Sequence, residues 1–383
     1  MLEAGGCRIL LDCGSKVGSS YTDYVDIPDP ETIDAIFVSH AHLDHMGGLA
    51  YASAVCSNAK IYMTDVTKEF VQYQLTATVG EYIGANTDEL RFHNRIHCKH
   101  IMNRVTVVDY YSAQGRINSL SKNASRARGG NIYTCETASG NKFQFVFFPS
   151  GHIPGGAMIY LNVGGKSILY TGDFASYYTY LTCPYSLPDN LTVDVLILCG
   201  THANKPGYEL ISDNPLSEIE TRFYSAASRC DRIVIPVSQL TKGLEIIAML
   251  SQKIESGVFP RHNIYLDSNL WELAKYYEYY SETFRLPSYI KRLEKSPSES
   301  EKVIVFEKNN YDAGRYSGYK KISQEFTLHA DYNDIVTLIE ILCPKQTYVV
   351  HTTKGEDCLC KEDRIPPKAR SIVYTEDMVA YNF

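Results

Sequence analysis

Short apolar runs with the residue types of β-strands dominate the first half of the chain. Helical periodicity is rarer there, and it is found mainly after His45 and between residues 65 and 75. The pattern therefore predicts a first half built mainly from strands. The predicted strands cover 8–12, 34–39, 60–64, 105–110, 142–150, 157–163 and 166–173.

From about residue 190 the pattern changes to an alternation of strands and helices. A helix between successive strands is the usual connection of a parallel sheet, so this segment predicts a parallel α/β unit. Its strands are expected at 193–199, 232–238 and 263–268, and its helices near 215–229, 242–256 and 269–281. The end of the chain adds a helix at 332–342, a strand at 346–351, and short strands in SIVYT and MVAYNF.

Composition is that of a folded chain. With 383 residues, 44% hydrophobic and 21% charged, the chain is long enough for two or three domains. No apolar run approaches the ~18 residues that a membrane span needs, and the start MLEAGG does not resemble a signal peptide. The formal net charge of −7 excludes a histone-like coat on nucleic acid, so a nucleic-acid partner would need a local basic patch.

Cysteine usage agrees with a reducing compartment. The eleven cysteines are scattered, and Cys358 and Cys360 form the one close pair. An odd number of cysteines without CxxC pairs or a secretion signal predicts free thiols rather than a disulfide framework or a zinc ribbon. We therefore expect a cytoplasmic protein that does not contact a membrane.

A group of histidine and carboxylate side chains directly follows the apolar strand DAIFV. It reads SHAHLDHMGG over residues 39–48, with three imidazoles and a carboxylate within six positions. If these groups were only packed in a core, each would need a buried partner of its own. Imidazole nitrogens and carboxylate oxygens are zinc ligands, and metal binding would satisfy all four groups at once. The segment predicts a site for two neighbouring ions held by His40, His42, Asp44 and His45.

This H-x-H-x-D-H motif after a hydrophobic strand resembles the metallo-β-lactamase fold family, and later segments resemble the other motifs of that family in order. Asp12 in ILLDCG resembles the first-motif carboxylate, which supports the ligand loop. His152 in GHIPGGA resembles a histidine ligand, and Asp173 in LYTGDF resembles the aspartate that bridges two metals.

The C-terminal part narrows the resemblance to the β-CASP subgroup, of the RNA-processing nuclease type. EFTLHADYNDI (325–335) and YVVHTTKGE (348–356) resemble motifs B and C of that subgroup. Segments 235–250 and 264–280 resemble its IPVFALGRAQEL and YLDSPLA. The implied fold class is α/β, a metallo-β-lactamase αββα sandwich with an inserted β-CASP α/β domain. The implied boundaries are 1–177 and 322–383 for the metallo-β-lactamase domain and 178–321 for the inserted domain.

The resemblance also implies a ligand set for two zinc ions. One ion would take His40, His42 and His152, the other would take Asp44, His45 and His351, and Asp173 would bind both. The implied catalytic residues are Asp44, Asp173 and His329, with His329 protonating the departing 3′-oxygen. The implied reaction is hydrolysis of an RNA phosphodiester by a metal-activated hydroxide. Cleavage would be endonucleolytic, and exonucleolytic action is left open.

A histidine at motif C, here His351, is the form of the RNA-processing members, so the resemblance favours single-stranded RNA over DNA. Motif A departs from its usual LILESTYG, because Cys199 occupies the position of the carboxylate and His202 follows three residues on. Either activity is reduced or retuned, or another group compensates. SQLTKG (238–243) likewise replaces ALGRAQ, and Lys242 would contact phosphate as a point charge. The candidate substrate contacts are Lys242, Arg315, Lys320, Lys321, Cys199 and His202.

Two other functions stay open. A scaffold homologue that binds RNA or a partner protein with weak or no cleavage is favoured by Cys199 and opposed by the complete ligand set. A small-ester or thioester hydrolase of the same fold is opposed by motifs B and C. Because few residues precede ILLD, a homodimer or a partner chain that supplies an edge strand is a further hypothesis.

Overall fold

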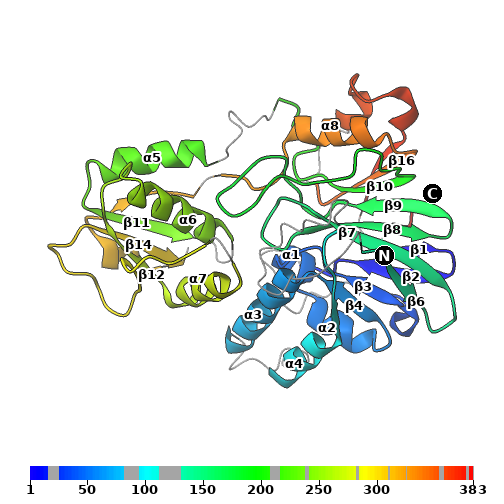
Figure 1. Ribbon diagram of the computed structural model, residues 1–383, viewed down its shortest axis with the longest axis horizontal. Coiled ribbons are helices and arrows are strands. Elements are labelled where there is room, and N and C mark those ends of the chain that lie inside the picture. The colour runs from blue at the N-terminus through cyan, green and yellow to red at the C-terminus, as the bar shows by residue number, and fades with distance from the viewer. Residues whose placement is uncertain are drawn as a thin grey trace.

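The computed structural model describes residues 1–15, 26–81, 95–111, 131–207, 216–237, 241–281, 284–308, 311–324, 326–352, 358–376 and 379–382. These residues form a larger lobe with two β-sheets and a smaller lobe with a third sheet (Figure 1). Within the described residues, no helix has the length and apolar character needed to cross a membrane. All eleven cysteines are free thiols, as the sequence predicted.

The first sheet of the large lobe follows chain order. Its strands are β1 (Leu2–Ala4), β2 (Cys7–Leu11), β3 (Ala35–Phe37), β4 (Lys60–Met63) and β5 (Val105–Val107), parallel except for the β1–β2 pair. Ile36 and Val38 face a cluster that includes apolar side chains of three helices. These helices cover the outer face of the sheet and are α2 (Leu49–Val55), α3 (Asp65–Glu81) and α4 (Arg95–Arg104).

The second sheet has seven strands. In spatial order they are β17 (Ile372–Tyr374), β16 (Gln346–Val350), β10 (Val195–Cys199), β9 (Lys166–Tyr170), β8 (Ala157–Val163), β7 (Lys142–Pro149) and β6 (Tyr133–Glu136). Helix α8 (Tyr332–Leu342) packs on the outer face through an apolar stripe that includes Ile335, Leu338 and Ile339. It begins with a capping box between Asp331 and Asp334, which explains why its predicted bounds match the structure.

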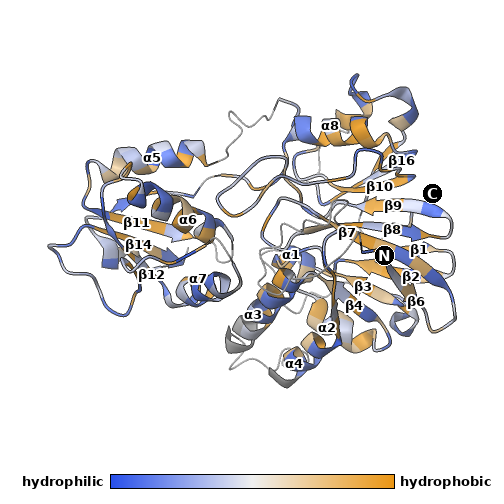
Figure 2. Cartoon of the chain, in the orientation of Figure 1, coloured by the Kyte–Doolittle hydropathy of each residue, from blue (hydrophilic) through white to orange (hydrophobic). Residues whose placement is uncertain are grey.

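The inner faces of the two sheets pack against each other. Alternating side chains from both sheets form this core, and Phe37 meets Phe145 edge to face at a centroid distance of 4.9 Å. With helices on both outer faces, the layers run α, β, β, α, which confirms the predicted sandwich. The hydropathy colouring in Figure 2 shows the apolar content of these strands.

The third sheet forms the small lobe and is parallel throughout. Its order is β13 (Ile290–Arg292), β12 (Asn263–Leu266), β14 (Val303–Lys308), β11 (Arg232–Val237) and β15 (Lys320–Lys321). Helices α5 (Ser217–Ala227), α6 (Thr241–Glu255) and α7 (Ser268–Tyr280) accompany the sheet (Figure 1). This confirms the parallel α/β unit. Short 3₁₀ turns lie at Pro30–Thr32, Ala313–Tyr316, Cys358–Lys361 and Pro367–Ala369.

One strand expected in that alternation lies elsewhere. The run at 193–199 forms β10, which pairs in parallel with β9 and β16 of the large lobe instead of with β11. Leu196 and Leu198 are fully buried there against α8. Among residues 379–382 of the predicted strand MVAYNF, no strand is formed. The placement of β10 brings Cys199 to the same sheet edge as the metal motifs.

Helix α6 is attached to the large-lobe side of the junction by a buried carboxylate. Glu245 is 1% exposed, and its carboxylate accepts hydrogen bonds from Thr179 Oγ1 at 2.7 Å and Tyr180 N at 3.0 Å. Burial raises the pKa of Glu245 from 4.5 to about 7, although these hydrogen bonds act to lower it.

We expect the Glu245→Gln variant to lose a pH dependence of stability that the wild type has. The folded protein holds a proton on Glu245 up to about pH 7, whereas the unfolded chain releases it near pH 4.5. This group therefore favours folding at low pH, and its contribution declines as pH rises through this interval, by up to about 3 kcal/mol. Urea unfolding of both proteins from about pH 5 to about pH 8 measures the difference. Parallel stability profiles would contradict the buried, proton-binding carboxyl.

Candidate metal centre

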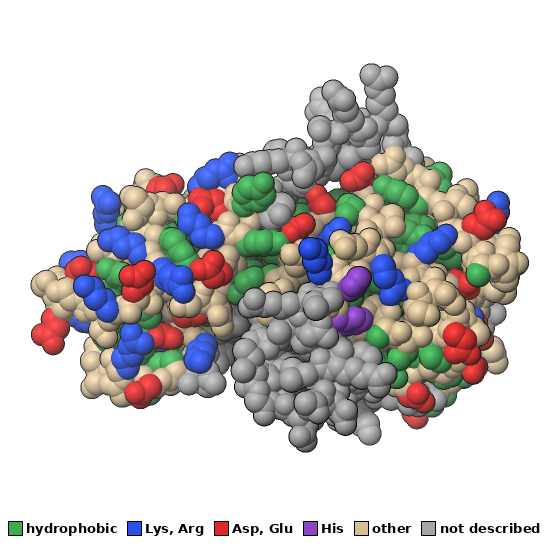
Figure 3. All heavy atoms as spheres, turned by 90° about the horizontal axis from the view of Figure 1, so that it is seen from below, with side chains coloured by type: hydrophobic (Ala, Val, Ile, Leu, Met, Phe, Trp, Pro, Cys, Tyr) green, Lys and Arg blue, Asp and Glu red, His purple; other side chains and the backbone are tan. Residues whose placement is uncertain are grey.

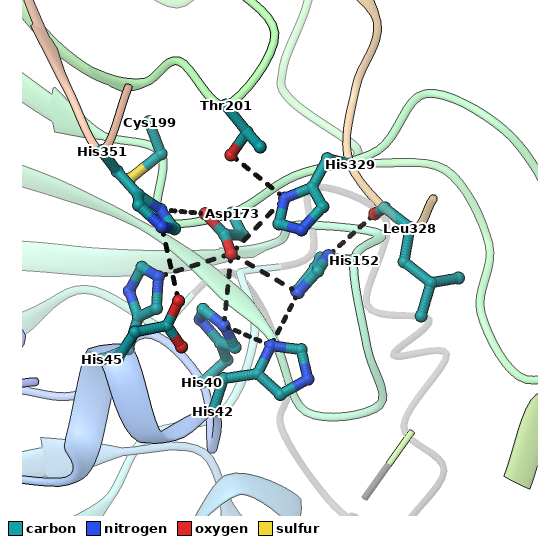
Figure 4. Close-up of polar contacts among 12 residues, drawn as sticks. His40, His42, His45, His152, Asp173, Cys199, Thr201, Leu328, His329 and His351 are labelled. Atoms are coloured by element: carbon teal, nitrogen blue, oxygen red, sulfur yellow. Dashed lines mark hydrogen bonds and ion pairs between the residues drawn. The ribbon is translucent and has the colours of Figure 1, made fainter. Parts of the chain in front are cut away.

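The residues of the predicted metal motifs converge at one edge of the two packed sheets (Figure 4). Each motif follows the carboxyl end of a strand. Asp12 follows β2, the histidine-rich loop follows β3, His152 follows β7, Asp173 follows β9 and His351 follows β16. His42 is the N-cap of the short helix α1 (Leu43–Met46), which carries Asp44 and His45. Because these strands end at the same edge of the sheets, the motifs that follow them meet there although they are far apart in the sequence.

One part of the centre consists of three imidazoles around a carboxylate. His42 Nδ1 lies 3.1 Å from His40 Nε2 and 3.1 Å from His152 Nε2. Asp173 Oδ2 is 3.6 Å from both of those Nε2 atoms. One ligand atom from each of these residues lies within 4.8 Å of the others. Imidazole lone pairs and a carboxylate oxygen that face one another suit a cation between them.

The second part shares Asp173 with the first. Its Oδ2 is 3.4 Å from His45 Nε2, and its Oδ1 accepts from His351 Nδ1 at 3.0 Å. His351 Nε2 lies 3.3 Å from Asp44 Oδ2. His45 Nε2 and Asp173 Oδ2 are buried atoms with no hydrogen-bond partner among the described residues. Buried polar atoms without partners are costly, and a divalent cation would satisfy both, so the nitrogen and oxygen donors present fit two zinc ions.

Four histidines of the candidate metal groups also have a contact at their second ring nitrogen, the one on the outer side of the centre. These contacts orient the rings and fix the tautomer that leaves the inward nitrogen free to bind a metal. The outer pairs are His40 Nδ1 with Ser39 Oγ (3.0 Å), His42 Nε2 with Thr241 Oγ1 (3.0 Å), His45 Nδ1 with Asp12 Oδ2 (2.6 Å) and His152 Nδ1 with the Leu328 carbonyl oxygen (2.8 Å).

Asp12 supports the loop that carries these histidines. Its carboxylate accepts from Ser39 N, Ser39 Oγ and Tyr170 Oη, each at 2.6 Å, besides its contact with His45. Its φ of 60° and the φ of 52° at His351 lie in the left-handed region, which residues other than glycine rarely adopt. Such conformations persist where the surroundings impose them, as the four contacts of Asp12 do.

Burial lowers the pKa of three of the histidines. The pKa of His40 falls well below its usual value, that of His42 falls to about 3, and that of His152 is also lowered. These rings are therefore neutral at neutral pH, the form that binds metals. Burial also acts to lower the pKa of His45, but Asp173 and Asp12 outweigh it and raise that pKa well above its usual value.

The two carboxylates keep their charge. Burial acts to raise the pKa of Asp44, but the hydrogen bond from His351 and the nearby histidines lower it to about 2. Burial also acts to raise the pKa of Asp173. His45, His329 and His351 outweigh this effect and hold the pKa well below the usual range. The centre therefore combines three neutral imidazoles with charged carboxylates, whereas hydrogen bonds to Asp173 and Asp44 raise the pKa of His351, as the carboxylates near His45 raise the pKa of that ring.

His329 approaches the centre from the loop before α8. Its Nδ1 lies 3.5 Å from Asp173 Oδ2 and 3.3 Å from Thr201 Oγ1, and its side chain is 27% exposed. Burial lowers the pKa of His329 to about 3. Cys199 contacts other groups, because its thiol donates to Tyr170 Oη at 3.7 Å and is hydrogen-bonded to His351. Thr201, two residues after the expected carboxylate position, is the neighbour of His329 that the sequence did not reveal.

The residues predicted to contact substrate have different surroundings. His202 is 7% exposed and lies beside His329 with a ring-centroid distance of 6.2 Å, and Lys242 is the second residue of α6, with Nζ 5.3 Å from the Phe326 ring centroid. Arg315 pairs with Glu307 at 3.5 Å, and Lys320 and Lys321 form β15. Figure 3 shows histidine side chains at the surface near the middle of the molecule, with basic side chains on either side. Contact of these residues and of buried Cys199 with substrate stays a prediction.

Known proteins resemble this chain in sequence. The model of a protein family described as Anti-Pycsar protein Apyc1 matches residues 1–82. An RNase J-like protein of Methanocaldococcus jannaschii is 27% identical over 279 residues, covering 71% of this chain and 56% of that protein. The transcription termination factor FttA of Methanothermobacter thermautotrophicus is 24% identical, covering 71% of this chain and 40% of that protein.

A eukaryotic protein is also similar in sequence. Cleavage and polyadenylation specificity factor 73 of Drosophila melanogaster is 27% identical over 259 residues, covering 66% of this chain and 33% of that protein. The chain therefore spans roughly half or less of the length of these curated relatives.

Proposed function

We infer that this protein, a homologue of the β-CASP nucleases of the metallo-β-lactamase fold family, is a zinc-dependent hydrolase that cleaves RNA phosphodiester bonds. The observation that carries the inference is the pair of histidine and carboxylate groups that both contact Asp173. Two buried ligand atoms of these groups have no hydrogen-bond partner in the part of the chain that the structure describes. RNA as substrate is supported by the relatives, whose names include an RNase J-like protein and endoribonucleases. We propose endonucleolytic cleavage of single-stranded RNA, with exonucleolytic cleavage open at the same centre.

We propose two zinc ions as cofactors. His40, His42 and His152 would hold one ion, Asp44, His45 and His351 would hold the other, and Asp173 would bind both. A bound metal pair would supply an activated water for attack and would neutralise charge on the phosphoryl oxygens. Asp12 would act by holding the His45 ring in the orientation that its 2.6 Å hydrogen bond defines.

The protein's own proton donor in this proposal is His329. Its ring is neutral in the free protein, because burial lowers its pKa to about 3. An anionic phosphodiester beside the ring would raise that pKa, since a nearby negative charge favours the imidazolium form. Thr201 Oγ1 lies at Nδ1, which leaves Nε2 to face the departing oxygen. His329 would then protonate that oxygen as the bond breaks.

Further features of the proposal concern organisation and location. We propose residues 178–321 as the inserted segment and 1–177 with 322–383 as the domain that holds the metals. The inserted segment contains the whole small-lobe sheet and also β10, which pairs in the large-lobe sheet. The eleven free thiols support a reducing compartment, so we propose a cytoplasmic location. A homodimer or a partner chain remains a hypothesis that light scattering of the purified protein tests.

The decisive experiment is cleavage of internally labelled single-stranded RNA and of DNA with the same sequence. We expect the zinc-loaded wild type to cut the RNA and the Asp44→Ala/His45→Ala variant to be inactive, because two members of the second ligand group are removed. His97→Ala is the matched control, since His97 Nε2 contacts the Ala50 carbonyl oxygen on the α2 side of the first sheet.

A specific alternative has its own outcome in this experiment. The buried Cys199, where the motif has a carboxylate, favours a scaffold that binds RNA without cutting it. If the wild type holds about two zinc ions per chain and binds the RNA but cuts neither substrate, the nuclease proposal is wrong and the scaffold is supported. Equal cleavage by the wild type and the double variant would also reject the proposed centre.

A further inference from the structure

One side chain of the small lobe reaches the candidate metal centre of the large lobe. Thr241, the first residue of α6, is 3% exposed, and its Oγ1 lies 3.0 Å from Nε2 of His42. The other ring nitrogen of His42, Nδ1, faces His40 and His152. Thr241 therefore holds the side of the His42 ring opposite to the position of the proposed ion.

The hydrogen-bond chemistry defines what this contact does. If Nδ1 binds a cation with its lone pair, the neutral ring must carry its proton on Nε2. That N–H then donates to Thr241 Oγ1, which orients the ring and selects the metal-binding tautomer.

His42 differs from its neighbours in the origin of its outer partner. The outer nitrogen of His40 is held by Ser39 and that of His45 by Asp12, both from the large lobe. His152 is held by the carbonyl oxygen of Leu328, in the loop before α8 of the same lobe. Within this set of four described contacts, the one made by Thr241 spans the two lobes.

The junction around Thr241 is tied at a second point. One helical turn later on α6, Glu245 accepts hydrogen bonds from Thr179 and Tyr180. The start of α6 is thus fixed against the segment that leads out of the large lobe.

We propose that Thr241 is a positioning residue through which the small lobe orients His42, so that metal affinity depends on the contact between α6 and the large lobe. Linkage requires the reverse as well, and a bound metal strengthens the contact of α6 with the large lobe by the same factor. The proposal rests on the metal centre of the proposed function, but it involves neither RNA nor cleavage.

The test compares Thr241→Val, which keeps the shape and removes the hydroxyl, with Thr241→Ser, which keeps the hydroxyl. Zinc affinity is measured by competition with a chromophoric chelator. We expect the valine variant to bind zinc about 10-fold to 100-fold more weakly, as for the loss of an outer hydrogen-bond partner, and the serine variant to bind as the wild type does. Thr221→Val is the matched control, because Thr221 lies on α5 and bonds within its own helix.

A second readout separates positioning from a general loss of stability. Hydrogen exchange of residues 241–255 is followed with and without zinc, and the melting temperature is followed without zinc. We expect zinc to slow exchange at the start of α6 in the wild type and the serine variant, and to do so much less in the valine variant. The melting temperatures of the metal-free proteins are expected to be similar.

Each outcome decides the proposal. A valine variant with wild-type zinc affinity and wild-type protection by zinc overturns it, and so does a wild type that binds no zinc. Weakened zinc binding that serine restores supports it even if the wild type cuts no RNA, in which case the nuclease proposal fails by itself.

Discussion

Replacement of Asp173 by asparagine is expected to remove bound zinc and RNA cleavage together. Asp173 Oδ2 lies 3.4–3.6 Å from nitrogens of His40, His45 and His152, and its Oδ1 accepts from His351. Asparagine keeps the size of the side chain but has a single, neutral acceptor oxygen, so it cannot serve both groups. Loss of an outer hydrogen-bond partner of a metal ligand lowers metal affinity by about 10-fold to 100-fold. We expect Asp173→Asn to lower zinc affinity by more than that.

Metal analysis and cleavage assays on the same preparations measure this effect. Asp189→Asn is the matched control, because Asp189 is exposed and precedes the amino end of β10, whereas the ligands follow the carboxyl ends of strands. A variant that unfolds would be recognised by circular dichroism, and a milder Asp173→Glu variant would then replace it. An Asp173→Asn protein that still holds the wild-type amount of zinc would show that Asp173 does not bridge the two groups.

Replacement of His329 by alanine is expected to slow cleavage by about 10²-fold to 10⁴-fold without loss of zinc. His329 lies 3.5 Å from Asp173 Oδ2 and is 27% exposed, as the proposed ligand His351 is at 35%. The side chains of the other ligand histidines for which an exposure is given are 1–4% exposed. This position suits a group that meets the substrate from the open side of the centre. Single-turnover cleavage of labelled RNA and zinc analysis measure the two quantities.

Thr201→Val provides a graded comparison with His329→Ala. Thr201 Oγ1 is 3.3 Å from His329 Nδ1, and its loss would free the ring without removing it. We expect a smaller decrease in the cleavage rate than for the alanine variant and a change in the pH profile, because the hydrogen bond that orients the ring is missing. Loss of zinc from His329→Ala would instead make His329 a ligand and reject its role as proton donor.

Local signals in the sequence explain what could be predicted of the fold. The apolar stripe of α8 and its capping residues define both ends of that helix, and the parallel unit follows from its strand and helix alternation. The strand at Val303–Lys308 lies at the centre of the small-lobe sheet but was not among the predicted strands. The run at 193–199 was recognised as a strand, but its sheet depended on pairing with β9 and β16, which no local pattern specifies.

The candidate site likewise combines residues that the sequence made recognisable with contacts that only the folded structure reveals. His40, His42, Asp44 and His45 stand within six residues, so their chemistry is visible in one segment, and the structure brings His152, Asp173 and His351 to them. The contact of Thr201 with His329 had no such signal, because threonine is common at strand ends. Cys199 was recognisable as a departure from the motif, but its contacts with Tyr170 and His351 depend on how β9, β10 and β16 pair.

The sequence by itself determined the α/β class and the clustered candidate metal-binding residues of 40–45, because these depend on residue type and short-range spacing. The layered sandwich and the ligands far apart in the chain were implied by the resemblance to the β-CASP subgroup. Only the tertiary structure decided which partners orient those residues. Thr241 lies 199 positions from His42, and Leu328 lies 176 positions from His152, yet each pair is within hydrogen-bond distance. Such contacts arise where separate segments pack together, so no local pattern in the chain encodes them.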